Sequence, residues 1–329
     1  MKVLHVLGAR GMGWSGGISA TLASLADSSL GSWVAFRQAT LDEALATARD
    51  WRPDLFIWHG ACSWRSLPTL IRLRRHCPGV GVEHHYSEAF THHCVPHRRR
   101  FHTLLRLSYG LMERVVAVSE GQARWIRAAR LAPSGRLRVI PSSRRLEEFL
   151  AVPAAASAPA PFRLLAYGRF TPQKGFDTLI RAVAALPAGL VELRLGGEGP
   201  QAEDLRALAA ARTGIAFIGR IDNVPEQLQD ADAVVVPSRW EPWGNVCLEA
   251  RAAARPVIVT AVDGLPEQAM GCGLVVPPDD VEALGQAIAS LVALPQPQRA
   301  ELGQAGRLSA AGAWQQYLAN WDALLREFR

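Results

Sequence analysis

The sequence predicts an α/β protein made of two doubly wound parallel-sheet domains. Short apolar runs alternate with helical stretches along the chain, which is the pattern of such folds. The apolar runs are nearly continuous, as expected for parallel strands that are buried on both faces. The length of 329 residues is sufficient for two domains of ordinary size.

Six strands are expected in each half, wherever a short apolar run lies between turn-forming residues. In the first half they are Val3–Leu7, Trp33–Phe36, Leu55–Trp58, Val80–Glu83, Val115–Val118 and Leu137–Ile140. In the second half they are Arg163–Tyr167, Val191–Leu195, Ile215–Ile218, Ala233–Val236, Val257–Thr260 and Leu274–Val276. Parallel sheets bind ligands at the carboxyl ends of their strands, so two linked sheets predict a cleft between those ends.

An Ala- and Pro-rich segment, Ala151–Pro161, has the composition of a semi-rigid linker between the halves. It predicts an N-terminal domain over residues 1–155 and a C-terminal domain over residues 156–329. The last helix, about 313–329, is expected to cross back to the N-terminal domain. Residues 1–155 hold 21 of the 36 Lys and Arg and 11 of the 30 Asp and Glu, a net charge of +10, whereas the remainder carries −4.

The composition indicates a globular protein of the cytoplasm. Hydrophobic residues make up 49% of the chain, and no apolar run approaches the ~20 residues that span a bilayer. The first residues, MKVLHVLGARG, break into glycines too soon for a signal sequence and are expected to form a buried strand. The five cysteines are scattered and form no CxxC pair, which fits reduced thiols better than disulfides or a zinc site.

The stretch PSRWEPWGNVCLE, Pro237–Glu249, carries the strongest chemical signal. It follows the strand expected at Ala233–Val236 and leads into a helix expected at Val246–Ala254, and a helix N-terminus favours an anion. The backbone N–H groups at that N-terminus come from Gly244, Asn245 and Val246. Glu241 enters the turn and Glu249 lies in the helix, and carboxylates accept hydrogen bonds from sugar hydroxyls. The alternative is an ordinary loop with two solvated glutamates.

A glycine-rich segment, GARGMGWSGGIS, follows the first expected strand. The spacing of Gly11, Gly13 and Gly16 matches a dinucleotide fingerprint only weakly, because the second strand ends in Arg37 where that fingerprint has an acid. A loop that closes on Gly16 and Gly17 at a helix start suits a phosphate better. The alternative is a plain glycine-rich connection.

Two cations follow the first strand of the second half, in LLAYGRFTPQKGFDTLIRAV. Gly168 gives a tight turn, Arg169 and Lys174 stand on the loop, and Gly175 opens a helix. Two cations at a strand end with no acid between them suit a diphosphate, with Arg as a fork and Lys as a point charge. Solvation at the surface is the alternative for either residue.

These segments together resemble the retaining glycosyltransferases of the GT-B fold, in the group usually numbered family 4. In the second half, YGRFTPQKG resembles the GR…KG phosphate loop of that family, and RLGGEGP its glycine-rich turn. EPWGNVCLE is similar to its E-x7-E motif, DGLPE to its GG-x-PE loop, and VVPPDD to the strand and turn that follow. In the first half the match is looser and covers the Gly-Gly loop, EHHY, AVSEGQARWI and RVIPSS.

The resemblance implies a role for each matching residue on the donor side. Arg169 and Lys174 would bind the diphosphate of a nucleotide sugar and steady the departing nucleotide, and Glu249 would bind the ribose hydroxyls. Glu241 would hold the transferred sugar with the backbone of Trp243, Gly244, Asn245 and Val246. Gly16 and Gly17 would reach across the cleft to the phosphates.

The resemblance also implies a histidine, His84 or its neighbour His85, beside the sugar and the acceptor. Family members retain the anomeric configuration and need neither a metal nor another cofactor. The residues agree with this, because Arg and Lys can neutralise the leaving charge that Mg²⁺ neutralises elsewhere.

The chain departs from the family pattern at three places. Ser142-Ser143 replaces the usual Asn-Gly, Ala254 precedes Arg255-Pro256 where a glycine is usual, and Asp263 stands where the first glycine of GG-x-PE is common. None of the three is expected to contact the cation pair or the two glutamates.

The segment His84–His102 holds six histidines and Cys94, so a metal site is conceivable, although its partners are not spaced for zinc. The following stretch, His97–Leu111, places leucines on one stripe of a helix with cations beside it. That pattern is typical of an interfacial basic helix, and the alternative is a core-packed helix with a solvated basic end.

Two other classes of protein have a similar two-domain shape. A sugar-nucleotide epimerase would need acid and base carboxylates on both faces of the sugar, which the His-rich, acid-poor loops of the first half do not offer. A solute-binding protein, or a non-catalytic binder of sugar nucleotides, is the second alternative. For a solute-binding protein a signal peptide would be expected, and the first residues do not read as one.

We therefore expect a cytoplasmic, metal-independent, retaining glycosyltransferase that moves a hexose-type sugar from a nucleotide-diphosphate sugar to an acceptor hydroxyl. UDP is the default nucleotide by family frequency, and Arg220 is placed to border its base. Contact of Arg98, Arg99 and Arg100 with an anionic membrane face would suit a lipid-linked or cell-envelope acceptor, and no nucleic-acid partner is expected.

Overall fold

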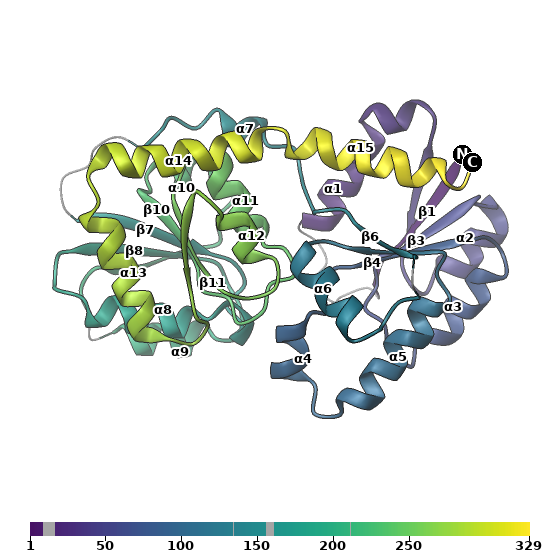
Figure 1. Ribbon diagram of the computed structural model, residues 1–329, viewed down its shortest axis with the longest axis horizontal. Coiled ribbons are helices and arrows are strands. Elements are labelled where there is room, and N and C mark those ends of the chain that lie inside the picture. Colours follow the sequence, from purple (N-terminus) through teal and green to yellow (C-terminus); the bar gives the residue numbers. More distant parts are fainter. Residues whose placement is uncertain (9–16, 134, 156–160, 211) are drawn as a thin grey trace. The chain divides into compact units, whose positions relative to one another are not determined.

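The computed structural model contains two six-stranded, fully parallel sheets with helices between the strands (Figure 1). It describes residues 1–8, 17–133, 135–155, 161–210 and 212–329. The first sheet has the strand order β2-β1-β3-β4-β5-β6 and the second has the order β12-β11-β10-β7-β8-β9. The predicted α/β fold class with two parallel sheets is confirmed.

The strands of the first sheet are β1 Lys2–Val6, β2 Ala35–Ala39, β3 Leu55–Trp58, β4 Gly79–Glu83, β5 Arg114–Ala117 and β6 Leu137–Val139. Those of the second are β7 Phe162–Tyr167, β8 Val191–Gly196, β9 Ile215–Gly219, β10 Ala233–Val236, β11 Val257–Thr260 and β12 Gly273–Val276. Every expected strand has an observed counterpart. The largest shift is at β2, because the N–H groups of Trp33 and Val34 donate back to the Leu30 carbonyl and close a short 3₁₀ turn first.

The helices of the first half are α1 Gly17–Ala26, α2 Ala44–Trp51, α3 Leu67–Arg74, α4 Glu88–Cys94, α5 Arg98–Gly110, α6 Glu120–Ala128 and α7 Glu147–Leu150. Those of the second half are α8 Phe176–Ala185, α9 Ala202–Ala209, α10 Val224–Gln229, α11 Asn245–Ala252, α12 Leu265–Ala269, α13 Val281–Ala293, α14 Gln296–Ala311 and α15 Ala313–Arg326. Two 3₁₀ turns, η1 Ser29–Ser32 and η2 Pro172–Lys174, complete the set among the described residues.

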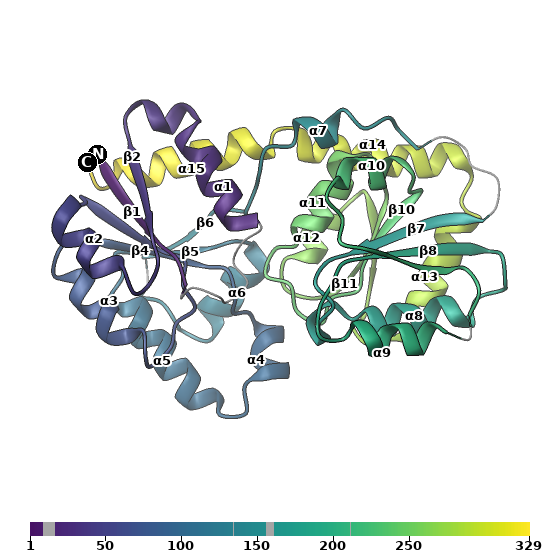
Figure 2. The ribbon, with the colours of Figure 1, turned by 180° about the vertical axis from the view of Figure 1, so that it is seen from behind.

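The chain divides into two compact units: unit 1 is Met1–Arg145 with Trp314–Arg329, and unit 2 is Leu146–Ala313. In unit 1, α2, α3, α5 and α6 cover one face of the first sheet, and α1 and α15 lie on the other (Figures 1 and 2). Helix α15 is tied to this unit by Glu327, which accepts hydrogen bonds from Arg114 and Arg138, and by Arg326, which lies over the Trp33 ring.

In unit 2, α8, α9 and α13 pack on one face of the second sheet, and α11 packs with α14 on the other (Figure 2). The boundary between the units lies at Arg145/Leu146, before the Ala/Pro segment that suggested a division at 155/156. The physical reason is that α7 packs against α11, and that Arg255 and Arg307 donate to the carbonyls of Pro153 and Val152. These contacts hold the residues just before the Ala/Pro segment on unit 2.

Candidate active site

The order of strands in unit 2 indicates where a ligand would be expected to bind. Its chain order runs outward from β7 through β8 to β9, and then from β10 through β11 to β12 on the other side. The direction of winding therefore reverses between the neighbouring strands β7 and β10. Ligands of doubly wound sheets bind outside the carboxyl ends of the strands at such a reversal. The loops that follow β7 and β10 carry the cations and glutamates that the sequence singled out.

The loop after β7 is shaped by two glycines. Gly168 has φ +146° and Gly175 has φ +62°, a region that side chains with a Cβ rarely adopt. A Cβ on Gly175 would lie 2.1 Å from the Pro237 carbonyl oxygen, so this loop approaches the loop after β10 at backbone distance. Between the glycines, η2 ends at Lys174, which points back toward the strand ends.

Lys174 and Glu241 form an ion pair across the two loops. Glu241 is 9% exposed, and its carboxylate also accepts a 3.2 Å hydrogen bond from the Ser238 hydroxyl. The backbone N–H of Glu241 donates to the Asp263 carboxylate at 2.8 Å. Asp263 has φ +45°, which explains why a glycine is common at this position of the family motif. The expectation that Asp263 does not contact either glutamate is therefore wrong, because its carboxylate accepts a hydrogen bond from the backbone of Glu241.

Helix α11 begins at Asn245, just after Gly244, whose φ is +95°. A Cβ on Gly244 would lie 2.7 Å from the Leu265 side chain, so only glycine fits this turn without a shift. No side chain caps the helix. Gln268 donates to the carbonyls of Trp243 and Gly244 and fixes the turn from which the helix begins.

Glu249 lies inside α11 and is 5% exposed. Its carboxylate accepts a 2.7 Å hydrogen bond from the hydroxyl of Tyr167, the last residue of β7. The solvated-glutamate alternative is therefore wrong for both glutamates. Tyr167 could not be recognised from the sequence, since a tyrosine that ends a buried strand is ordinary.

Arg239 links the loop after β10 to the loop after β7, and this role was also not predicted from the sequence. It donates to the Pro172 carbonyl at 2.7 Å and forms ion pairs with Asp177 at 2.9 Å and Asp279 at 2.6 Å. Burial acts to raise the pKa of Asp177, but the hydrogen bond and charge of Arg239 outweigh it and lower that pKa. The arrangement fixes the backbone that carries Lys174.

Arg169 and Arg220, which were also predicted to bind the nucleotide sugar, are more exposed to solvent. Arg169 is exposed on the loop after β7. Arg220 follows β9, the edge strand, where its side chain is 77% exposed and lies 3.3 Å from the Asp222 carboxylate. Because β8 lies between β7 and β9, Arg220 is about 10 Å of sheet away from β7. Its contact with a base stays a prediction.

In unit 1, His84 and His85 lie in a turn directly after β4. Glu83, the last residue of that strand, is 4% exposed and accepts 2.8 Å hydrogen bonds from the N–H groups of His85 and Tyr86. Its second carboxylate oxygen accepts a hydrogen bond from the Tyr109 hydroxyl at 2.5 Å. One buried carboxylate thus fixes the turn. Gly17 begins α1, whereas Gly16 falls outside the described residues.

Helix α5 corrects one expectation. Leu104 and Leu105 are buried, and Phe101 and Leu111 pack against the core of unit 1. Of the leucines in this helix, only Leu107 is largely exposed, at 48%. For the leucine stripe the interfacial interpretation is therefore wrong, and the alternative of a core-packed helix with a solvated basic end is confirmed, because α5 turns that stripe toward the sheet and leaves its arginines in solvent.

The histidine-rich segment spans α4 and the start of α5. Its residues His92, His93 and His97 are exposed. Within the described parts of the chain, His, Cys, Asp and Glu form no group of three placed to hold a metal ion. Within those same parts, no helix is both long and apolar enough to cross a membrane.

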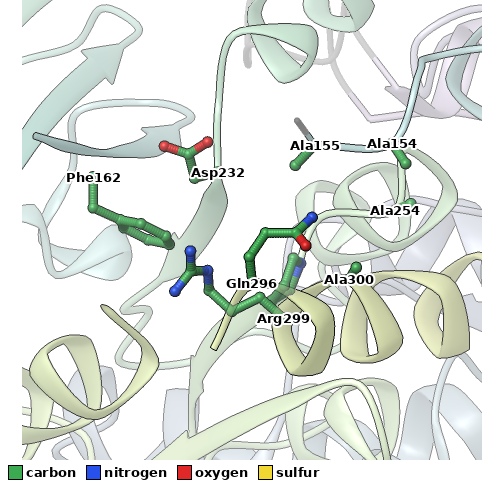
Figure 3. A pocket seen from close by; sticks show the side chains of 9 residues that line it. Ala154, Ala155, Phe162, Asp232, Ala254, Gln296, Arg299 and Ala300 are labelled. Carbon is green, nitrogen blue, oxygen red and sulfur yellow. The ribbon is translucent and has the colours of Figure 1, made fainter. Parts of the chain in front are cut away.

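A small cavity of unit 2 lies away from these loops (Figure 3). Phe162 begins β7, and Asp232 and Pro256 immediately precede β10 and β11, so the cavity is at the amino ends of the strands. Its volume of about 30 Å³ has room for a few water molecules. It is therefore too small for a nucleotide, and it lies at the amino ends of the strands, opposite the carboxyl ends that carry the candidate site.

Comparisons with known sequences find glycosyltransferases. Residues 161–293 match the family model described as glycosyl transferases group 1, and residues 30–147 match that of glycosyltransferase family 4. A D-inositol 3-phosphate glycosyltransferase of Mycobacterium avium is 31% identical over 236 residues, which are 66% of this chain and 54% of that relative. The lipopolysaccharide core biosynthesis glycosyltransferase LpsE of Rhizobium meliloti is 38% identical over 136 residues, 40% of this chain and 39% of the relative. The chain thus spans about half or less of the length of these curated relatives.

Solved structures show the same fold over the whole chain. Sucrose-phosphate synthase from Thermosynechococcus elongatus superposes with a TM-score of 0.81 at 21% identity, covering 99% of both chains. HepE of Anabaena, solved in complex with UDP and glucose, superposes with a TM-score of 0.76 at 17% identity, covering 98% of both. Both family models and the shared fold agree with the motifs at the ends of β7 and β10. The chain belongs to the group 1 glycosyltransferases of family 4.

Proposed function

We propose that this chain is a retaining, metal-independent glycosyltransferase that uses a nucleotide-diphosphate sugar, with UDP as the default nucleotide. The transferred group is a hexose-type sugar, and the acceptor is a hydroxyl of a lipid-linked or cell-envelope glycan precursor. Family membership favours this reading over an epimerase or a solute-binding protein.

The observation that carries the proposal is the convergence at the reversal between β7 and β10. Lys174 and Glu241 meet there as an ion pair, beside the uncapped N-terminus of α11. A diphosphate matches both features, because the ammonium and the helix N–H groups are donors directed at an anion. Once the diphosphate binds Lys174, Glu241 is released to accept hydrogen bonds from the sugar hydroxyls.

Metal independence follows from the same residues. In a site of low water content, Lys174 together with Arg169 supplies the positive charge that stabilises a departing nucleotide diphosphate. Retention of configuration rests on the resemblance to the family. His84 is placed on the sugar and acceptor side by that resemblance, and the buried Glu83 fixes the turn that presents it.

Solved relatives support the choice of donor. HepE of Anabaena has been solved with UDP and with UDP-glucose. The names of the relatives, among them an inositol phosphate glycosyltransferase and a lipopolysaccharide core enzyme, support a hydroxyl acceptor in a glycolipid or envelope glycan.

Glu241 and Glu249 are expected to bind different parts of the nucleotide sugar. Glu249→Gln should weaken binding of bare UDP about tenfold, because the ribose hydroxyls lose a charged acceptor. Glu241→Gln should leave UDP binding within about twofold and instead slow sugar transfer, because we expect its carboxylate to bind the sugar part of the donor and not the nucleotide. Isothermal titration calorimetry with UDP and turnover of the sugar donor measure the two effects. Equal affinity of both variants for UDP contradicts this division of roles.

We propose a peripheral membrane contact through the basic surface formed by Arg98, Arg99 and Arg100. All three are exposed at the start of α5. Leu107 lies two helical turns from Arg100 on the same side, and the Arg100 guanidinium lies over the ring of Trp64, which is 43% exposed. An anionic surface would attract each arginine with about 1 kcal/mol, and Trp64 and Leu107 supply the apolar contact that the buried leucines do not.

Replacing Arg98, Arg99 and Arg100 together by glutamine should abolish binding to anionic vesicles at low salt. The unaltered chain should sediment with phosphatidylserine vesicles but not with neutral ones, and raising the salt should release it. A matched control replaces Arg124, Arg127 and Arg130, three exposed arginines of the same unit. No binding of the unaltered chain would point to a small soluble acceptor. Equal loss in the control would show that the overall charge of unit 1, and not this basic surface, attracts the vesicles.

A further inference from the structure

Three histidines of unit 1 form a hydrogen-bonded ladder across neighbouring strands. His5 lies in β1, His59 directly follows β3, and His84 directly follows β4, and these three strands are adjacent in the sheet. His5 Nδ1 lies 2.8 Å from His59 Nε2, and His59 Nδ1 lies 3.0 Å from His84 Nε2. The rings are stacked, with centroids 5.1 Å and 5.2 Å apart. The ladder begins at the reversal of strand order between β1 and β3.

The ladder is uncharged at neutral pH. His5 is 1% exposed and His59 is 2% exposed, whereas His84 is half-buried. Burial lowers the pKa of His5 and of His84 to about 3, and it lowers the pKa of His59 well below its ordinary value. The neighbouring imidazoles, His85 included, add to the effect on His59 and His84. Each neutral ring then has one N–H donor and one acceptor nitrogen.

Two proton orders satisfy both hydrogen bonds of a neutral ladder. In the outward order every ring carries its proton on Nδ1, so His5 donates to His59 and His59 donates to His84. In the inward order every ring carries its proton on Nε2, and the last N–H belongs to His5. His5 Nε2 is buried and has no hydrogen-bond partner among the described residues. A buried N–H without an acceptor is rarer than an acceptor without a donor, so the outward order is favoured.

We infer that His5 and His59 are positioning residues that hold His84 as the Nδ1–H tautomer, so that its second ring nitrogen presents an N–H donor and not an acceptor. The nitrogen that one ring presents is set by the hydrogen bond that its other nitrogen makes. His84 is then a neutral donor toward an oxygen of the bound sugar and does not accept the proton of the acceptor hydroxyl. This consequence rests on the proposed function, whereas the tautomer itself does not.

The first test is ¹⁵N NMR of the full chain with labelled histidine at pH 7, with ring signals assigned by single variants. The expected result is a proton on Nδ1 and none on Nε2 in His5, His59 and His84. A proton on Nε2 of His84, or a doubly protonated ring, would overturn the inference. The result does not depend on activity, so it stands apart from any failure of the proposed function.

The second test compares two replacements of His59. His59→Asn keeps an amide N–H at the position of the ring's Nδ1, from which it can donate to His84 Nε2, whereas His59→Leu keeps apolar volume and loses the donor. Turnover of the sugar donor should fall about tenfold in the leucine variant, and within about threefold in the asparagine variant, with binding of bare UDP unchanged in both. A purely structural role gives the opposite order, because a buried site accommodates leucine better than asparagine. Turnover in the leucine variant equal to or above that of the asparagine variant would therefore overturn the inference. His76→Asn, at an exposed histidine of the same unit, is the matched control.

Discussion

Replacing Lys174 by methionine is expected to lower turnover of the sugar donor by about two orders of magnitude or more. The ammonium is the charged group that the structure holds at the reversal between β7 and β10, where a departing diphosphate develops its charge. Loss of one such contact in a water-poor site typically costs 10²–10³-fold in rate. Arg169→Ala should act in the same direction, because it removes the second cation of the loop.

The measurement is release of nucleotide diphosphate under saturating donor, together with the melting temperature of each variant. Lys174→Arg is the matched control, since it keeps the charge and should retain more activity than Lys174→Met. Lys174→Met also leaves Glu241 without its cation, so a modest fall in stability is expected. Normal turnover in both Lys174→Met and Arg169→Ala would remove the diphosphate assignment.

Replacing Arg255 by methionine is expected to destabilise unit 2 by about 3–5 kcal/mol. Arg255 is 1% exposed and donates to the carbonyls of Leu228, Ala253 and Pro153 at 2.7, 2.8 and 2.9 Å. Burial lowers its pKa to about 10, so it stays charged at neutral pH. Methionine fills similar space but leaves those buried carbonyls without donors, and each unsatisfied group costs about 1–3 kcal/mol.

Differential scanning calorimetry measures this effect as a fall of about 10 °C in the melting temperature of unit 2. Arg181→Met is the control, because the Arg181 side chain is 53% exposed and its ion pair with Asp177 contributes less than about 1 kcal/mol. A melting temperature for Arg255→Met within 2 °C of the unaltered chain would show that these carbonyl contacts do not hold the unit together.

The sheets could be predicted almost completely from the sequence. Strands buried on both faces are short apolar runs such as Leu55–Trp58 and Ala233–Val236, and no tertiary knowledge is needed to find them. The loops after β7 and β10 could be predicted because glycines and charged residues at strand ends have few other uses. Both Lys174 and Glu241 could be predicted as site residues in this way, although the ion pair between them could not.

The contacts that hold the site could not be predicted, because they join residues far apart in the sequence. Tyr167 meets Glu249 across 82 positions, and His5 meets His59 across 54. The sequence around Arg239 does not indicate that it links the two loops, because its partners Asp177 and Asp279 follow different strands. Whether the leucines of α5 contact the sheet or a membrane could not be predicted for a related reason. An amphipathic pattern shows that one face of a helix is buried, but not whether protein or lipid covers it.

The most direct test of the central claim is release of nucleotide diphosphate by the unaltered chain in the presence of EDTA. UDP-glucose, UDP-galactose, GDP-mannose and ADP-glucose are incubated in turn with the chain, and slow hydrolysis of the donor is followed by the nucleotide released. The expected result is release from at least one of these donors without a divalent cation, and loss of that release in Lys174→Met. No release from any donor, together with no thermal stabilisation by UDP, GDP or ADP, would contradict it.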